Sequence, residues 1–233
     1  QIYWIDIVNR KLYSIKEGRQ NCVFEGVEGV TAVAPHQEGG FVMSFSTQIM
    51  HLNSQGNILP LSDFKIANKN LRFNDGKCDA LGRFWVGSMD CKESEDSGSL
   101  YVLEKGHIHK VLDGICISNG LCWNSDSTLF YFIDSARQAI EVFDYDADKI
   151  KLSNRRTLYQ IPEAEVYPDG MCIDNEGNLW VALWNGHGVI CINPKTGKVI
   201  QKLELPCRKA TSCCFGGDKL DELYVTTDSR NED

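Results

Sequence analysis

The chain has 233 residues and a formal net charge of -8 at pH 7, and 42% of its residues are hydrophobic. The acidic balance argues against a nucleic-acid partner and against an anionic membrane surface, and no apolar run reaches the roughly 18 to 20 residues that span a bilayer. The length suits one large domain, and the hydrophobic content suffices for a packed core.

Six copies of a short strand-like pattern recur along the chain, each an aliphatic residue or Phe followed by an aromatic residue or Val. In chain order they are Ile2-Tyr3-Trp4-Ile5, Phe41-Val42-Met43, Phe84-Trp85-Val86, Leu129-Phe130-Tyr131, Leu179-Trp180-Val181 and Leu223-Tyr224-Val225. Their second residues are separated by 39, 43, 45, 50 and 44 positions. Repeats of roughly 40 to 50 residues built from short strands are typical of propeller blades, each of about four strands.

The repeat therefore predicts an all-β, six-bladed β-propeller that forms a single domain over residues 1–233, with its first and last blades incomplete. In one repeat we expect strands at residues 77–80, 83–89, 99–103 and 107–112, separated by turns and by a polar loop at 90–98. No segment has the apolar periodicity of a helix.

Small oxygen-bearing side chains share one position of the repeat, eleven residues before the second residue of the pattern. They are Thr31, Asn74, Asn119 and Asp169, together with Ser212 when one extra residue is allowed in its repeat. Three of them, Asn74, Asn119 and Asp169, are followed within two residues by Gly, which permits a tight turn or a close backbone approach. Because the innermost strand of every propeller blade starts at the central channel, we expect these side chains to form a ring.

Asn and Asp oxygens are hard ligands that suit calcium, magnesium or manganese. Asn119 and Asp169 are expected on neighbouring inner strands, where a further acidic ligand could complete a cation site. The alternative is that the Asn-Gly and Asp-Gly pairs are ordinary turns, but their recurrence at one position of the repeat favours a site. Arg72 could bind hydroxyl or carboxylate oxygens through its guanidinium group, and an ordinary surface Arg is the competing interpretation.

Ten cysteines are present, and no Cys-x-x-Cys pair suggests a zinc site. Four of them recur shortly after the ring position of their repeats, namely Cys78, Cys122, Cys172 and Cys214. A free Cys in a strand interior behaves as a small apolar residue. We therefore expect buried, reduced thiols and a cytoplasmic location.

Several longer motifs resemble the regucalcin family, which is also called the senescence marker protein, gluconolactonase and luciferin-regenerating enzyme family. They are residues 72–77 (RFNDGK), 117–121 (ISNGL), 130–135 (FYFIDS), 168–174 (PDGMCID) and 211–217 (TSCCFGG). The similarity runs over essentially the whole chain, in order. It implies a six-bladed propeller with one divalent cation, such as calcium, zinc, magnesium or manganese, in the central channel.

The resemblance also implies roles for individual residues. Asn119 and Asp169 match metal ligands, and Asp169 also matches the general base. Arg72 and Asn74 match substrate-binding positions, and Glu93 stands in for a further substrate-contacting Glu in a loop that is shorter here. The metal-binding Glu of the family lies before the segment that matches the start of this chain, so the given sequence lacks it. The C-terminal strands that close the propeller in the family are also missing from the given sequence.

These matches predict a metal-dependent lactonase, a carboxylic ester hydrolase acting on small sugar lactones such as gluconolactone, with no nucleic-acid or membrane partner. A calcium-binding regulator without turnover is one alternative, and an inactive propeller scaffold or fragment is another. Because one ligand and the ring-closing strands are missing, we expect the chain as given to be less stable and less active than a longer form.

Overall fold

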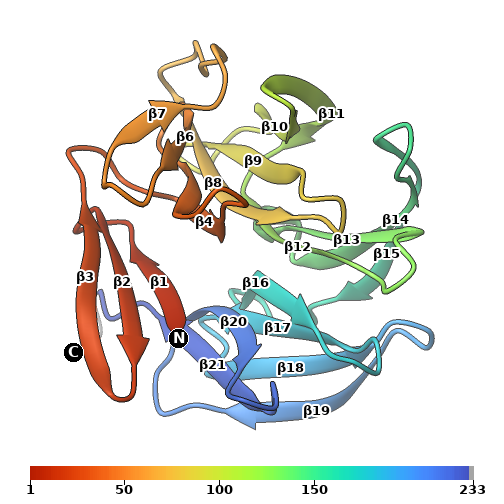
Figure 1. Cartoon of the computed structure of the whole chain (residues 1–233). Coiled ribbons are helices and arrows are strands. Elements are labelled where there is room, and N and C mark those ends of the chain that lie inside the picture. Colours follow the sequence, from red (N-terminus) through yellow and green to blue (C-terminus); the bar gives the residue numbers. More distant parts are fainter. Residues whose placement is uncertain (231–233) are drawn as a thin grey trace. The chain divides into compact units, whose positions relative to one another are not determined.

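The computed structural model describes residues 1–230, in which β-strands dominate and one short 3-10 helix, η1 (Ser135–Arg137), is present. The chain divides into two compact units, one from Gln1 to Ser118 and one from Asn119 onward. Figure 1 labels the strands of both units.

The first unit holds three antiparallel sheets that follow one another along the chain. The first sheet has the order β1 (Ile2–Asp6), β2 (Lys11–Lys16), β3 (Arg19–Glu25). The second has the order β4 (Ala32–Pro35), β5 (Phe41–Ser44), β6 (Ile49–Leu52), β7 (Ile58–Pro60). The third has the order β8 (Leu71–Cys78), β9 (Phe84–Asp90), β10 (Gly98–Glu104), β11 (His107–Ile115).

The second unit repeats this construction. Its first sheet runs β12 (Ser118–Trp123), β13 (Leu129–Asp134), β14 (Ala139–Asp146), β15 (Lys151–Gln160), with Ser118 as the last residue of the preceding unit. The next sheet runs β16 (Tyr167–Ile173), β17 (Leu179–Trp184), β18 (Gly188–Asn193), β19 (Lys198–Glu204). The last sheet pairs β20 (Ala210–Gly216) with β21 (Glu222–Thr227).

The prediction of repeated short antiparallel strands is confirmed, and the four strands expected in one repeat correspond to β8–β11. Across residues 1–230 four sheets have four strands each, whereas the first has three and the last two, so six complete blades are not present. The inner strand of the third sheet starts at Leu71, six residues earlier than position 77 where the sequence placed it. The ring position therefore lies inside the strand and not in a turn before it.

Apolar side chains from facing sheets form the core of each unit. In the first unit, Leu12, Met43 and Phe45 pack together between the first two sheets, and Phe73 and Phe84 belong to a second cluster further along. In the second unit the largest cluster joins residues of β13 and β14 to residues of β16–β18. Burial of a side chain of this size contributes about 1.5–3 kcal/mol, which makes these clusters the main source of stability.

The turn between the first two strands of a sheet is organised by one side chain at a repeated position. Asp79 Oδ1 accepts hydrogen bonds from the backbone N–H groups of Leu81 and Arg83, both at 3.0 Å. Its Oδ2 accepts from the side chains of Arg83 at 2.7 Å and Trp85 at 3.0 Å. Because Asp and Asn carry acceptors close to the backbone, they fix such turns and hold the register of the hairpin.

Asp174 takes the same position in another sheet, where its Oδ1 accepts from the N–H groups of Glu176 at 2.9 Å and Asn178 at 2.8 Å. Its Oδ2 accepts from Trp180 Nε1 at 2.9 Å. The recurring Asp and Trp pair therefore has a structural role, which explains part of the sequence repeat.

All ten cysteines are free thiols in this structure. Cys122 and Cys172 are buried, as the sequence predicted, but Cys78 is only half-buried. The prediction was wrong for Cys214, which is exposed, because its neighbour Cys213 is the residue that faces the core. Cys213 Sγ lies 3.7 Å from Cys172 Sγ.

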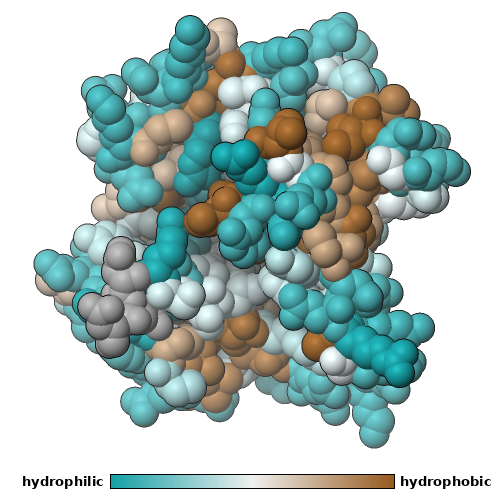
Figure 2. Space-filling view, turned by 90° about the vertical axis from the view of Figure 1, so that its left-hand side faces the viewer, coloured by the Kyte–Doolittle hydropathy of each residue, from teal (hydrophilic) through white to brown (hydrophobic). Residues whose placement is uncertain are grey.

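On the face that Figure 2 shows, apolar residues occur among hydrophilic ones. Val8 and Val27 in the first unit and Ile200 in the second are examples of exposed apolar residues. Among the described residues, no helix has the length and apolar character required to cross a bilayer.

Candidate functional site

The ring residues of three sheets lie at β-bulges of the innermost strand. The register of β8 against β9 shifts between Phe73 and Gly76, and the register of β16 against β17 shifts between Pro168 and Met171. A similar shift between Ala210 and Ser212 occurs in the last sheet. A bulge bends the strand and redirects the side chain that it carries, which is why bulges are common next to functional sites. Asn74 and Asp169 are therefore bulge residues, and the interpretation as simple turns is wrong for them.

Asn119 is buried and its amide is oriented by a short hydrogen-bond chain. Asn119 Nδ2 donates to Ser135 Oγ at 2.7 Å, and the Ser135 hydroxyl donates to the backbone oxygen of Pro168 at 2.6 Å. Because the hydroxyl proton is used on Pro168, the Ser135 oxygen can only accept from Asn119. This fixes which end of the amide faces Ser135, and the Oδ1 atom is turned away from it.

The chain of bonds ends next to Asp169, since Pro168 is its neighbour in β16. Gly120, which follows Asn119, brings the two backbones together: a Cβ atom at Gly120 would lie 2.7 Å from the backbone oxygen of Asp169. Gly170 serves the same purpose against the next inner strand, where a Cβ would lie 2.3 Å from Ser212 Oγ. These glycines are needed for close approach of neighbouring strands and not for a left-handed turn.

Asn119 and Asp169 are thus brought to adjacent strands, as predicted, and Asp169 is half-buried. Amide and carboxylate oxygens are hard donors of the kind that bind calcium, magnesium or manganese, and the role of these two residues as metal ligands stays a prediction. Ser135 was missed by the sequence reasoning, although it stands at the end of the FYFIDS motif. The signal that could have found it is its position one residue after β13, the strand that neighbours β12, where Asn119 lies.

Arg72 and Asn74 lie together in the first unit. Arg72 Nη1 donates to Asn74 Oδ1 at 2.7 Å and to the backbone oxygen of Phe73 at 3.0 Å. Asn74 Nδ2 donates to the backbone oxygen of Ser118 at 2.8 Å. Both side chains are half-buried, so polar groups of the pair are held in fixed positions rather than being free to rotate in solvent.

Asp75 follows Asn74 in the same bulge and is a carboxyl group with an unusual environment. Burial raises the pKa of Asp75 above its ordinary value, against the opposing effects of the Lys77 charge and of the hydrogen bond from the Gly76 N–H. That bond measures 2.7 Å from Gly76 N to Asp75 Oδ1. Desolvation penalises the charged form, and here it outweighs both favourable contacts.

Glu93 lies in an exposed loop after β9, with a positive φ of 57°. The loop begins beside the start of β8, because Cys91 N donates to the backbone oxygen of Asn70 at 2.7 Å. Glu93 is therefore near the same end of the sheet as Arg72, which pairs with Met89, and its role in substrate binding stays a prediction. Thr31, the ring residue of the second sheet, instead bonds Ser44, with 2.8 Å between the two hydroxyl oxygens.

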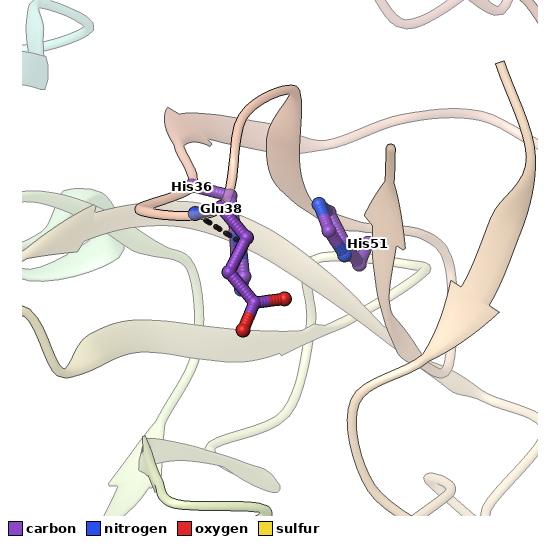
Figure 3. Close-up of side chains that lie close together, drawn as sticks. All are labelled: His36, Glu38 and His51. Carbon is purple, nitrogen blue, oxygen red and sulfur yellow. Dashed lines mark hydrogen bonds between the residues drawn. The ribbon is translucent and has the colours of Figure 1, made fainter. Parts of the chain in front are cut away.

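A second polar cluster, which the sequence reasoning did not identify, consists of His36, Glu38 and His51 (Figure 3). The imidazole rings of His36 and His51 are stacked with centroids 3.8 Å apart and planes inclined by 26°. Burial, and next the proximity of His51, lower the pKa of His36 below its ordinary value. His36 and Glu38 lie in the turn between β4 and β5, whereas His51 lies in β6. The pairing of β5 with β6 brings the turn residues and His51 together.

Comparison with known proteins places these observations in a family. The family described as SMP-30/Gluconolactonase/LRE-like region matches residues 1–229. Regucalcin from Sus scrofa is 41% identical over 238 aligned residues, which cover 97% of this chain and 78% of that protein.

Solved structures agree with the sequence match. A luciferin-regenerating enzyme superposes with a TM-score of 0.91 at 33% identity, covering 97% of this chain and 79% of the enzyme. Regucalcin from Agrobacterium tumefaciens, described as a calcium-binding protein, has a TM-score of 0.92 at 23% identity, over 99% of this chain and 79% of that protein. The prediction of an all-β propeller fold is therefore confirmed.

Proposed function

This chain belongs to the SMP-30/gluconolactonase/LRE-like family, and we propose that it is a divalent-metal-dependent lactonase that opens small sugar lactones. The observation that carries the proposal is the placement of Asn119 beside the Asp169 backbone, with its amide oriented through Ser135. An amide held in this way presents its oxygen in a defined direction, which is what a ligand or a substrate contact requires.

Asn119 and Asp169 are the residues of this chain that we propose to hold one divalent cation, with calcium, zinc, magnesium and manganese as the candidates. The donor set fits, because both residues offer oxygen atoms and Asp169 contributes a negative charge to compensate for burial of the ion. When bound, the cation supplies polarisation of the lactone carbonyl and favours deprotonation of a nearby water molecule.

Asp169 is the proposed general base. Its carboxylate takes a proton from the attacking water while the new C–O bond forms at the lactone carbonyl carbon. The bond from that carbon to the ring oxygen then breaks, and the protonated Asp169 returns this proton to the ring oxygen, which leaves as an alcohol. Proton transfer of this kind contributes about 10²- to 10⁴-fold to the rate.

Substrate binding is the proposed role of Arg72, Asn74 and Glu93. The Arg72 guanidinium is a planar group of N–H donors, the kind of group that binds substrate oxygen atoms, and its bond to Asn74 Oδ1 at 2.7 Å fixes its position. Glu93 is exposed and carries acceptor oxygens that suit sugar hydroxyl groups. No nucleic acid or membrane partner is part of the proposal.

The test is lactone hydrolysis by Asp169→Ala, measured as acid release from several sugar lactones with calcium, zinc, magnesium or manganese added. Turnover should fall by about 10²-fold or more with every metal. Asp126→Asn is the matched control, because Asp126 is an exposed turn residue of the same unit and should keep full activity. Turnover by Asp169→Ala at the level of the control would reject the assignment.

A calcium-binding protein without turnover is the second candidate, and the similarity to the calcium-binding regucalcin from Agrobacterium tumefaciens favours it. Calorimetric calcium titration alongside the lactone assay separates the two, since a binding protein takes up calcium and releases no acid. A six-bladed architecture and a cytoplasmic location are further parts of the proposal, supported by the six successive sheets and by the ten free thiols.

A further inference from the structure

The His36, Glu38 and His51 cluster lies away from the ring position of its sheet. Thr31 immediately precedes β4 and His36 immediately follows it, so the strand separates them by five residues, or roughly 16 Å. One nitrogen or oxygen atom from each of the three side chains lies within 4.8 Å of the others. The cluster therefore lies at the other end of β4 from the ring position of its own sheet, and it shares no residue with the proposed lactonase site.

His51 is already oriented as a metal ligand. Its Nε2 atom lies 2.8 Å from the backbone oxygen of Gly39. Since a carbonyl oxygen can only accept, Nε2 carries the proton and Nδ1 bears the lone pair that a metal ion needs. Metal-binding histidines commonly donate their second ring N–H to a backbone carbonyl, which fixes both tautomer and ring direction. His51 is also buried, at 8% exposure, so its ring is held in place.

His36 stands at the repeated turn position that Asp79 and Asp174 occupy in other sheets, but it holds its turn less firmly. Its Nδ1 accepts a single bond from the Glu38 N–H at 3.2 Å, whereas Asp79 Oδ1 accepts two at 3.0 Å. A 3.2 Å bond is at the long end of the normal range. A metal ion can therefore compete for the His36 ring at the loss of one long hydrogen bond.

We propose that His36, Glu38 and His51 form a second cation site, specific for a borderline transition metal with zinc as the best fit. Two imidazole nitrogens and one carboxylate match a three-ligand zinc site with an open fourth position. The same donors disfavour calcium and magnesium, which require oxygen ligands. This separates the cluster from the oxygen-only pair of Asn119 and Asp169.

Small movements complete the site. Zinc bonds of about 2.0–2.1 Å in tetrahedral geometry bring ligand atoms to roughly 3.4 Å from one another. The ligand atoms lie within 4.8 Å here, so the required shift is small. His36 and the exposed Glu38 can supply it, because both stand on the short turn between β4 and β5, while His51 stays fixed. The stacked rings must move apart as the metal enters between the nitrogens and the carboxylate.

The experiment is zinc titration by calorimetry, together with cobalt absorption in the visible range, on the whole chain carrying Asp169→Ala. That background removes the charged ligand of the other proposed site, so the result is independent of the lactonase proposal. We expect one zinc ion to bind, and cobalt to give the intense absorption of a tetrahedral site with nitrogen ligands.

His36→Asn is the decisive variant, because Asn124 occupies the equivalent turn position and its Oδ1 accepts from the N–H groups of Thr128 at 3.0 Å and Leu129 at 2.8 Å. The variant therefore keeps the turn and removes one ligand. Zinc affinity should fall at least about tenfold in His36→Asn and also in Glu38→Gln, and the cobalt absorption should disappear. His109→Asn, which removes an exposed imidazole on β11, should change neither.

Zinc affinity that is equal in His36→Asn and in the parent chain would overturn the proposal, as would the absence of zinc binding and tetrahedral cobalt absorption in the Asp169→Ala background. Circular dichroism melting of each variant shows that the turn is intact. Loss of zinc binding with an unchanged melting temperature supports the site.

Discussion

Ser135→Ala tests whether a buried hydroxyl outside the predicted ligand set controls cation affinity. The substitution removes the acceptor of the 2.7 Å bond from Asn119 Nδ2 and the donor of the 2.6 Å bond to the Pro168 oxygen. Without them the Asn119 amide loses the contact that distinguishes its nitrogen from its oxygen. Loss of an outer partner of a metal ligand typically costs 10- to 100-fold in affinity, or about 1.4–2.7 kcal/mol.

The assay is calorimetric titration with calcium and with manganese, combined with urea unfolding. Because Ser135 is buried at 4% exposure, the free energy of unfolding should also fall, by about 1–3 kcal/mol. Ser88→Ala is the matched control. Ser88 is equally buried and has two bonds to Ser99, at 3.2 and 2.9 Å, but it lies in the first unit. It should lose similar stability and keep its cation affinity.

The double variant Ser135→Ala with Asn119→Ala distinguishes positioning from general weakening. If Ser135 acts through Asn119, the double variant binds the cation no more weakly than Asn119→Ala alone. Additive losses of affinity would refute the reasoning, and so would a Ser88→Ala variant that loses as much affinity as Ser135→Ala.

Three further outcomes are expected. Asp79→Ala should lower the free energy of unfolding by about 3–5 kcal/mol, because the buried Arg83 guanidinium loses its 2.7 Å ion pair and keeps the longer 3.7 Å contact with Glu104. Asp174→Ala removes hydrogen bonds from neutral donors, among them the Trp180 indole and the Asn178 amide, and should cost about 1–3 kcal/mol. Equal losses in urea denaturation would contradict this difference. Gly170→Ala should lower the melting temperature and weaken cation binding, because the new Cβ would lie 2.3 Å from Ser212 Oγ of the next inner strand. An unchanged melting curve would count against that close approach. Burial raises the pKa of Asp75, so the contribution of this carboxyl group to stability is complete below its pKa in the unfolded chain and is lost as pH rises through its pKa in the folded chain. Asp75→Asn should therefore stabilise the chain more at about pH 7 than at about pH 3. Thermal unfolding at both pH values measures the difference.

The repeat was readable from the sequence because strand formation is a local property. Aromatic and β-branched residues favour extended backbone, and Gly, Asn and Asp mark the turns. The recurring Trp of Phe84-Trp85-Val86 and Leu179-Trp180-Val181 also had a local cause, since each indole N–H bonds an Asp six residues earlier. Spacing alone was therefore enough to predict the all-β class.

The site was only partly predictable. Asn119 and Asp169 were found because they recur at one position of the repeat. Ser135, by contrast, lies outside that position, and its function depends on a bond to Pro168, which is 33 residues away in the sequence. The first half of β8 was likewise left out of the predicted strand, which began at residue 77, because a bulge at Asn74 interrupts the alternation that identifies a strand.

Composition and spacing by themselves determined which residue types recur and how often, and hence the class of fold and the hard-ligand character of the ring. Tertiary structure decided which atoms meet: Gly120 against the Asp169 backbone, the Asn119 amide against a hydroxyl from another strand, and two imidazoles from a turn and a neighbouring strand. The physical reason is that backbone preference acts over a few residues, while contacts between strands depend on register and bulges that no short stretch of sequence encodes.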